Sequence, residues 1–94
     1  MNLSEIRAEI DSVDEAMLQL FLKRMRLSEL VAEYKKAHDL PIYNAEREEE
    51  ILSWVSRESG EFDKYACEFF MNLFKLSRLR QEDLLAVWDQ TGNT

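Results

Sequence analysis

The chain of 94 residues contains few of the residues that interrupt helices or cross-link chains, with two glycines, one proline, one cysteine and one histidine. A single cysteine excludes an internal disulfide, and one cysteine with one histidine argues against a zinc site built by the protein. No apolar run approaches the ~20 residues of a membrane span, and the N-terminus lacks the basic and then apolar pattern of a secretory signal. We therefore expect a cytoplasmic protein with no membrane partner.

Positive charge is scarce too, because 12 Lys and Arg stand against 19 Asp and Glu, a formal net charge of −7. Such a chain repels nucleic acid unless its basic residues are clustered. Arg24 and Arg26 are close in sequence, as are Lys35 and Lys36, but no block of five or six basic residues forms. We expect no nucleic-acid partner, and a small anionic ligand would need a local positive pocket.

The first 40 residues, which contain neither glycine nor proline, show the periodicity of one long helix. Apolar side chains recur there at alternating spacings of three and four, which is the pattern of a buried helix face. The apolar stripe consists of Leu3, Ile6, Ile10, Val13, Met17, Leu20, Leu27, Val31 and Tyr34. This pattern predicts a helix from about Leu3 to about His38, with Asn2 and Glu5 resembling a capping box and Ser4 as a rival cap.

Two further helices are predicted after Pro41, which biases the residue before it toward an extended conformation. The second is short, begins after Asn44 as its cap and fades near Gly60. The third runs from about Asp63 to about Trp88, and residues 91–94 are expected to form a frayed tail. No alternation of period two competes with these assignments, so we predict an all-α fold of three helices that forms one domain over residues 1–94.

The length of the first helix favours a homodimer. A helix over residues 3–38 is ~54 Å long, whereas a compact monomer of this size has a diameter of roughly 32 Å. The apolar stripe continues along the overhang, so Ile6, Ile10 and Val13 need cover. Long helices packed against each other in a homodimer would supply it. A bent helix inside a monomer is the alternative.

Arg24 interrupts the apolar stripe of the first helix. A guanidinium does not give up its proton in proteins, so a buried one needs an anionic partner or a polar cavity. Lys35 lies close to three turns further on, ~16 Å away on nearly the same face, and Ser28 lies between them. The gap between the two basic heads would suit a small dianion. The alternative for Lys35 is a solvated lysine near a helix end.

Arg7 cannot reach the same ligand from the same helix. Seventeen residues separate it from Arg24, which gives ~25 Å of rise and an angular offset of roughly 100°. If Arg7 joins the site, it must come from a partner chain. A surface arginine in the first helical turns is the alternative.

The other two helices also carry polar side chains that could face Arg24. Asn44, Arg47 and Glu48 share one face of the second helix, although a cap and a solvated charge run explain them equally well. Ser77 and Gln81 are spaced i, i+4 on the third helix, at positions where the stripe predicts apolar residues. Because buried polar side chains need partners, they would line a polar cavity opposite the basic residues.

At these residues the chain resembles the all-helical chorismate mutases of aromatic amino acid biosynthesis, and the resemblance covers nearly the whole chain. The matching positions are Arg7 in IRAEIDSVDEAML, Arg24 in FLKRMRLSELV, Lys35 in EYKKA, Arg47 and Glu48 in NAEREEEIL, and Ser77 and Gln81 in LSRLRQEDLL. Asn44 is the one departure, because the bacterial pattern has an aspartate there. An amide can still form a hydrogen bond with a hydroxyl.

The resemblance implies an interlocked homodimer with two sites, a Claisen rearrangement of chorismate to prephenate, and no metal or cofactor. It also implies a role for each residue. The substrate carboxylates would be clamped by Arg24 and the partner's Arg7 with help from Arg47 and Ser77. Lys35 would contact a carboxylate and the ether oxygen, Gln81 would donate to that same oxygen, and the ring hydroxyl would donate to Glu48, beside Asn44.

Two other functions remain open from the sequence. An isochorismate pyruvate lyase of the same fold would release pyruvate and salicylate, but the lyase pattern has an apolar residue at the position of Glu48. A helical dimerisation module without an active site would use Arg24, Ser77 and Gln81 as buried specificity devices, at some cost in stability.

Overall fold

A computed structural model of the chain describes residues 1–92, which form four helical elements. In chain order these are α1 (Leu3–Ala37), α2 (Ala45–Ser59), the 3-10 turn η1 (Gly60–Phe62) and α3 (Asp63–Gly92). No strand occurs in residues 1–92. The predicted all-α class is therefore confirmed.

The predicted boundaries need two corrections. Residues 3–37 and 45–92 form two helical stretches rather than three separate helices, because η1 joins α2 to α3 with no non-helical residue between them. The second correction concerns the C-terminus, where α3 continues past the predicted end near Trp88 as far as Gly92. Thr91 thus belongs to the helix rather than to a frayed tail, and residues 93–94 lie outside the described residues.

Asn2 caps α1 as predicted, but its return bond to Glu5 comes from its side-chain amide rather than from the backbone N–H of a full capping box. The Asn2 side-chain oxygen accepts the backbone N–H of Glu5 at 2.8 Å, and its amide donates to the Glu5 carboxylate at 3.1 Å. The first bond satisfies one of the backbone N–H groups that a helix start leaves unpaired, and the second joins the two side chains. Ser4, the rival cap, lies inside the helix.

α1 ends in a Schellman motif that turns the chain toward α2. The backbone N–H of Leu40 donates to the Lys35 carbonyl at 2.8 Å, and that of Asp39 donates to the Lys36 carbonyl at 3.3 Å. This motif requires a left-handed residue at its centre, and Asp39 adopts it with φ 55°. An aspartate occupies a position that glycine would occupy with less strain.

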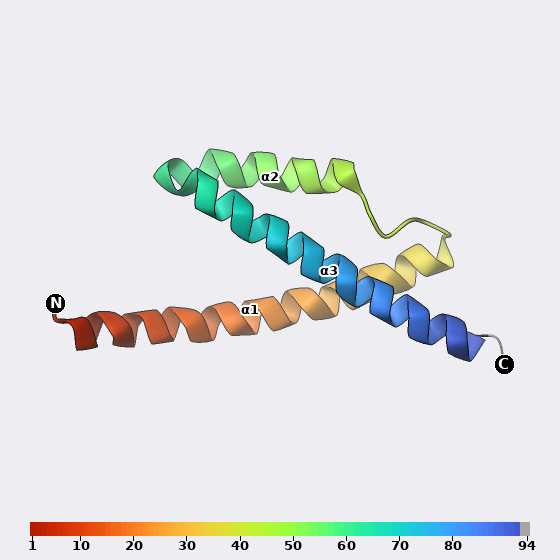
Figure 1. The fold of residues 1–94 in the computed structure, drawn as a ribbon, viewed down its shortest axis with the longest axis horizontal. Coiled ribbons are helices and arrows are strands. Elements are labelled where there is room, and N and C mark those ends of the chain that lie inside the picture. Colours follow the sequence, from red (N-terminus) through yellow and green to blue (C-terminus); the bar gives the residue numbers. More distant parts are fainter. Residues whose placement is uncertain (93–94) are drawn as a thin grey trace.

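α3 packs against both other helices and holds the fold together. Asn44 caps α2 through its side-chain oxygen, which accepts the Arg47 N–H at 3.1 Å. Gly60, at φ 55° and ψ −127°, ends α2 in a conformation that side chains rarely adopt. There the chain reverses, so α2 and α3 form a hairpin and α3 crosses the C-terminal half of α1, while the N-terminal half of α1 extends freely (Figure 1).

The chain is extended, as the length of α1 predicts. It measures 60 × 27 × 14 Å, and its radius of gyration is 17.1 Å, against ~12 Å for a compact chain of this length. The accessible surface is 7614 Å², whereas a compact monomer of this size would expose about 5,700 Å². One chain alone therefore leaves roughly 1,900 Å² more surface in water than a compact fold would.

Little of the chain is fully buried, and the buried set is partly polar. Ala32, Val55 and Phe74 are the buried apolar residues in the described part of the chain, beside the buried polar residues Ser28 and Gln81. The apolar stripe of α1 is mostly exposed, with Leu3 60%, Ile10 51% and Val13 56% accessible. Over residues 1–92, none of the helices is long and apolar enough to cross a membrane.

Candidate active site

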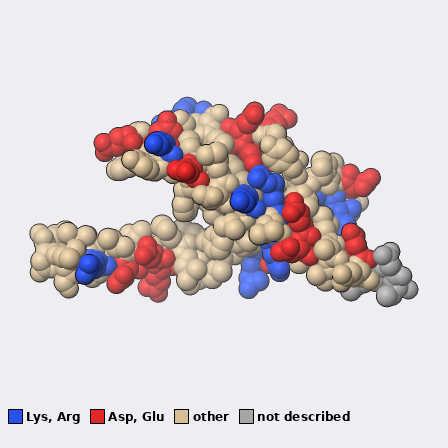
Figure 2. Space-filling model, viewed as in Figure 1, with Lys and Arg blue, Asp and Glu red and all other residues tan. Residues whose placement is uncertain are grey.

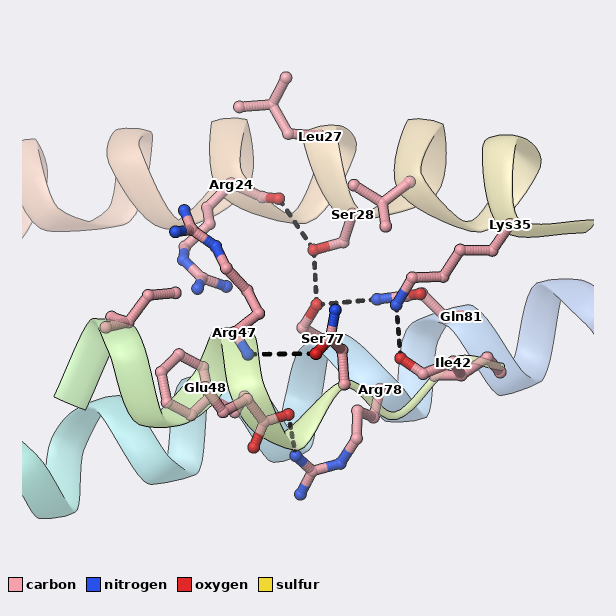
Figure 3. A pocket seen from close by; sticks show the side chains of 14 residues that line it. Arg24, Leu27, Ser28, Lys35, Ile42, Arg47, Glu48, Ser77, Arg78 and Gln81 are labelled. Atoms are coloured by element: carbon pink, nitrogen blue, oxygen red, sulfur yellow. Dashed lines mark hydrogen bonds and ion pairs between the residues drawn. The ribbon is translucent and has the colours of Figure 1, made fainter. Parts of the chain in front are cut away.

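A cavity of about 310 Å³ lies where α3 meets the C-terminal half of α1 and the first turns of α2 (Figure 3). All three helices and the connection before α2 contribute to it. The lining residues are Arg24, Leu27, Ser28, Val31 and Lys35 of α1, Ile42 and Asn44 of the connection, Arg47, Glu48 and Ile51 of α2, and Phe74, Ser77, Arg78 and Gln81 of α3. Seven of the eight site residues predicted from the sequence are thus brought together.

Arg7 is the predicted residue that is not brought to the cavity. It lies in the free N-terminal part of α1, where every residue from Met1 to Leu20 is exposed. The placement agrees with the helix geometry, in which one straight helix cannot direct both Arg7 and Arg24 at one small ligand. A role for Arg7 through a partner chain stays a prediction.

The cavity is a positive region in an acidic protein. Its charged lining consists of four cationic side chains and one carboxylate, namely Arg24, Lys35, Arg47, Arg78 and Glu48, a local formal charge of +3. Elsewhere acidic side chains are spread over both arms of the molecule (Figure 2). Cationic side chains that converge on a pocket with low-dielectric walls attract a small anion. A polyanion would extend beyond the pocket and be repelled by the surrounding carboxylates.

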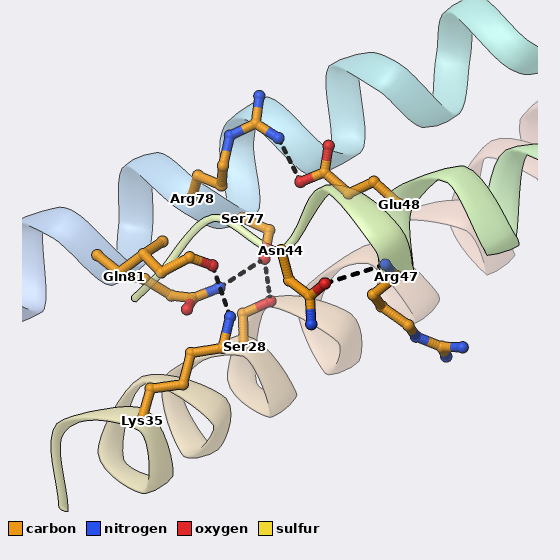
Figure 4. Close-up of polar contacts among 9 residues, drawn as sticks. Ser28, Lys35, Asn44, Arg47, Glu48, Ser77, Arg78 and Gln81 are labelled. Atoms are coloured by element: carbon orange, nitrogen blue, oxygen red, sulfur yellow. Dashed lines mark hydrogen bonds and ion pairs between the residues drawn. The ribbon is translucent and has the colours of Figure 1, made fainter. Parts of the chain in front are cut away.

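A directed chain of hydrogen bonds joins α3 to α1 at the floor of the cavity (Figure 4). Ser28 Oγ donates to the Arg24 carbonyl at 3.1 Å. Because a hydroxyl has only one proton, the 2.7 Å contact between the two serines is donated by Ser77. Gln81 Nε2 in turn donates to Ser77 Oγ at 3.2 Å. These bonds fix the orientation of the Gln81 amide.

The Gln81 amide keeps unused hydrogen-bonding capacity at the cavity. Gln81 is only 5% exposed. Its Oε1 atom has no hydrogen-bond partner among the described residues. One of its two N–H groups is used by Ser77, so the second remains for a ligand. A buried amide with free capacity is costly unless something in the cavity completes it.

Lys35 is held at the mouth of the same cavity. Its Nζ donates to the Ile42 carbonyl at 2.5 Å, which ties the amine to the connection before α2. Burial lowers the pKa of Lys35, and the nearby charge of Glu48 opposes that change. The contacts argue against the fully solvated lysine that the sequence left open.

Arg24 is half-buried and faces another cation. Its guanidinium carbon lies 5.7 Å from the centre of the Phe74 ring. Burial is the larger cause that lowers the pKa of Arg24, and the charge of Arg47 is the second. Two guanidinium groups at one wall repel each other, and an anion bound between them would remove that repulsion.

Arg78 is a charged wall residue that the sequence analysis missed. It forms an ion pair with Glu48, and its guanidinium carbon lies 5.1 Å from the centre of the Tyr43 ring. Helical periodicity gave no signal for it, because its partners belong to α2 and to the connection before α2. Its position beside Ser77 in the sequence was the available hint.

Comparison with known proteins finds a matching family model and several similar sequences. The family model described as chorismate mutase type II matches residues 6–82. The chorismate mutase of Methanocaldococcus jannaschii is 43% identical over 86 residues, which cover 88% of this chain and 87% of that protein.

Two longer proteins also match part of the chain. The T-protein of Haemophilus influenzae is 50% identical over 46 residues, 49% of this chain and 12% of that protein. The bifunctional chorismate mutase/prephenate dehydratase of Aquifex aeolicus is 41% identical over 59 residues, 63% of this chain and 16% of that protein. The chain thus matches only a small part of these two relatives. No solved structure matches it significantly.

Proposed function

The chain belongs to the type II chorismate mutase family, and we propose that it catalyses the rearrangement of chorismate to prephenate for aromatic amino acid synthesis. The observation that carries the proposal is the local charge of +3 around a cavity of about 310 Å³ in a chain of net charge −7. Its volume falls within the range of small-molecule sites. Chorismate is a small dianion, so its charge and size suit this cavity.

Binding is the first part of the mechanism. The rearrangement is unimolecular, so the site accelerates it by holding the enolpyruvyl group over the ring in the reactive conformer. Arg24 and Arg47 lie on one side of the cavity and Lys35 on the other, which supports a grip on the carboxylates at separate points. Ser77 assists from the floor. The planar arginine fork can meet a carboxylate with two hydrogen bonds.

Charge stabilisation is the second part. Negative charge develops on the ether oxygen as its bond to the ring carbon breaks, and preorganised donors stabilise that charge most effectively. Lys35 supplies a concentrated positive charge, and Gln81 supplies the N–H that Ser77 does not use. The hydrogen-bonded chain beneath Gln81 supports this assignment, because it orients the donor before the substrate binds.

The ring hydroxyl is assigned to Glu48 and Asn44. Glu48 accepts a hydrogen bond from this hydroxyl, a role that favours the mutase over the lyase. Asn44 uses its side-chain oxygen to accept the Arg47 N–H, so its amide N–H₂ is the part available to the ligand. Where an aspartate would offer a further acceptor, this chain offers a donor.

The active form is proposed to be a homodimer in which each site receives the partner's Arg7. The surface excess of roughly 1,900 Å² per chain supports this, because it is the scale that an obligate dimer buries. The exposed apolar stripe of α1 supplies the surface to be covered. Arg7 lies outside the cavity of its own chain, as a residue donated to the other site would.

Incubation of the purified protein with chorismate tests the proposal. We expect the ultraviolet absorbance of chorismate to fall at a rate proportional to protein concentration, with prephenate accumulating. A folded dimer that leaves chorismate unchanged beyond the uncatalysed rate would overturn the proposal and favour the dimerisation module.

A further inference from the structure

We propose that Arg78 is a positioning residue of the active site, which holds the Glu48 carboxylate in the orientation that receives the ring hydroxyl of the substrate. This inference rests on the proposed function. It concerns a residue of α3 that contacts no substrate atom in the roles assigned above and acts through another side chain.

Arg78 and Ser77 are neighbours in the sequence but face different helices. Successive residues of a helix project about 100° apart. Ser77 therefore meets Ser28 of α1, while Arg78 reaches across to Glu48 of α2 (Figure 4). The ion pair is partly shielded from water, with side-chain exposures of 29% for Arg78 and 22% for Glu48. It joins α2 to α3 at the cavity wall.

The guanidinium of Arg78 is itself held in place. Its central carbon lies 5.1 Å from the centre of the Tyr43 ring, on the connection that precedes α2. A guanidinium over an aromatic face is attracted by the ring and loses rotational freedom. Arg78 thus has a fixed position from which to orient Glu48.

The contact with Arg78 occupies one carboxylate oxygen of Glu48 and leaves the other for the substrate. Arg78 Nη1 donates to Glu48 Oε2, so Oε1 is left as an acceptor for a ligand hydroxyl. The other nearby arginine does not compete, because Arg47 Nη1 pairs with Glu50 at 2.9 Å. Without Arg78, the attraction between Glu48 and Lys35 would be unopposed. Glu48 would then turn toward Lys35 and engage the amine that the ether oxygen needs.

Steady-state kinetics of Arg78→Met, Glu48→Gln and the double variant test the inference. We expect Arg78→Met to lower kcat/KM for chorismate about 10-fold or more, the scale of a misplaced group in an organised site. In the Glu48→Gln background the same change should have little further effect, because residues that act through one another are not additive. Arg78→Lys, which keeps the charge without the planar fork, should restore part of the loss.

Arg80→Gln is the matched control on the same helix. Arg80 pairs with Glu29 at 3.7 Å and lies outside the cavity, so this variant should keep the wild-type kcat/KM. An equal loss from folded Arg78→Met in both backgrounds, or no loss in either, would overturn the positioning role; rates are therefore expressed per folded protein, measured by circular dichroism. A wild-type protein inert toward chorismate would instead overturn the proposed function itself.

Discussion

Two inactive variants should restore activity to each other if each site is built from two chains. Within one α1, Arg7 lies ~25 Å along the helix from Arg24 and roughly 100° around it, and it is absent from its own chain's cavity. Arg7→Ala would therefore damage the partner's site, whereas Lys35→Ala damages its own. In a dimer of the two variants, one site carries both defects and the other carries neither.

The size of the recovery follows from counting sites. If the two variants are unfolded together and refolded at equal concentration, random pairing makes half of the dimers mixed. Each mixed dimer has one intact site of two, so the mixture should regain about a quarter of wild-type activity. Each parent should have about 1% or less, the scale for losing one charged contact at a reacting group. The assay is the initial rate of chorismate loss before and after joint refolding.

A matched mixture provides the control. Lys35→Ala and Gln81→Leu both lie in the cavity of one chain, so their mixed dimers contain no intact site and should recover nothing. Recovery in both mixtures, or in neither, would refute a site completed across the dimer. Full activity of Arg7→Ala alone would refute it as well.

Four further predictions concern three single residues. Lys35→Ala should lower kcat at least ~10²-fold, and wild-type kcat/KM should fall as pH rises through the pKa of Lys35, because the protonated amine is the active form. Since burial lowers that pKa, the fall should lie below the ordinary value of 10.5, which a pH–rate profile will check. Arg24→Leu should abolish activity yet raise the midpoint of thermal unfolding, because it removes a half-buried cation repelled by Arg47; a lower midpoint would contradict this. Asp39→Gly should raise the free energy of unfolding by roughly 0.5–1 kcal/mol in urea titrations by relieving its left-handed backbone, and a destabilised variant would show that the aspartate has an unrecognised partner.

Local signals predicted the start of each long element. The Asn2 and Asn44 caps depend on contacts within three residues, so the sequence carries the whole interaction. Gly60 was recognised as the end of a helix, but its reversal within a continuous helical stretch was not. That reversal depends on the packing of α2 against α3, which no local pattern encodes.

The candidate site was predictable where a polar residue broke an apolar pattern. Arg24, Ser77 and Gln81 stood out for this reason, and the structure brings them together. Arg78 did not, because its partners lie across helices. The length of α1 predicted that Ile6, Ile10 and Val13 would lack cover within one chain, and they are 41%, 51% and 56% exposed.

The central claim is that chorismate rearranges to prephenate in this cavity. The most direct test supplies chorismate and isochorismate separately to the purified protein and identifies the products by chromatography. We predict conversion of chorismate to prephenate, with far slower release of salicylate and pyruvate from isochorismate. Faster turnover of isochorismate than of chorismate would contradict the account.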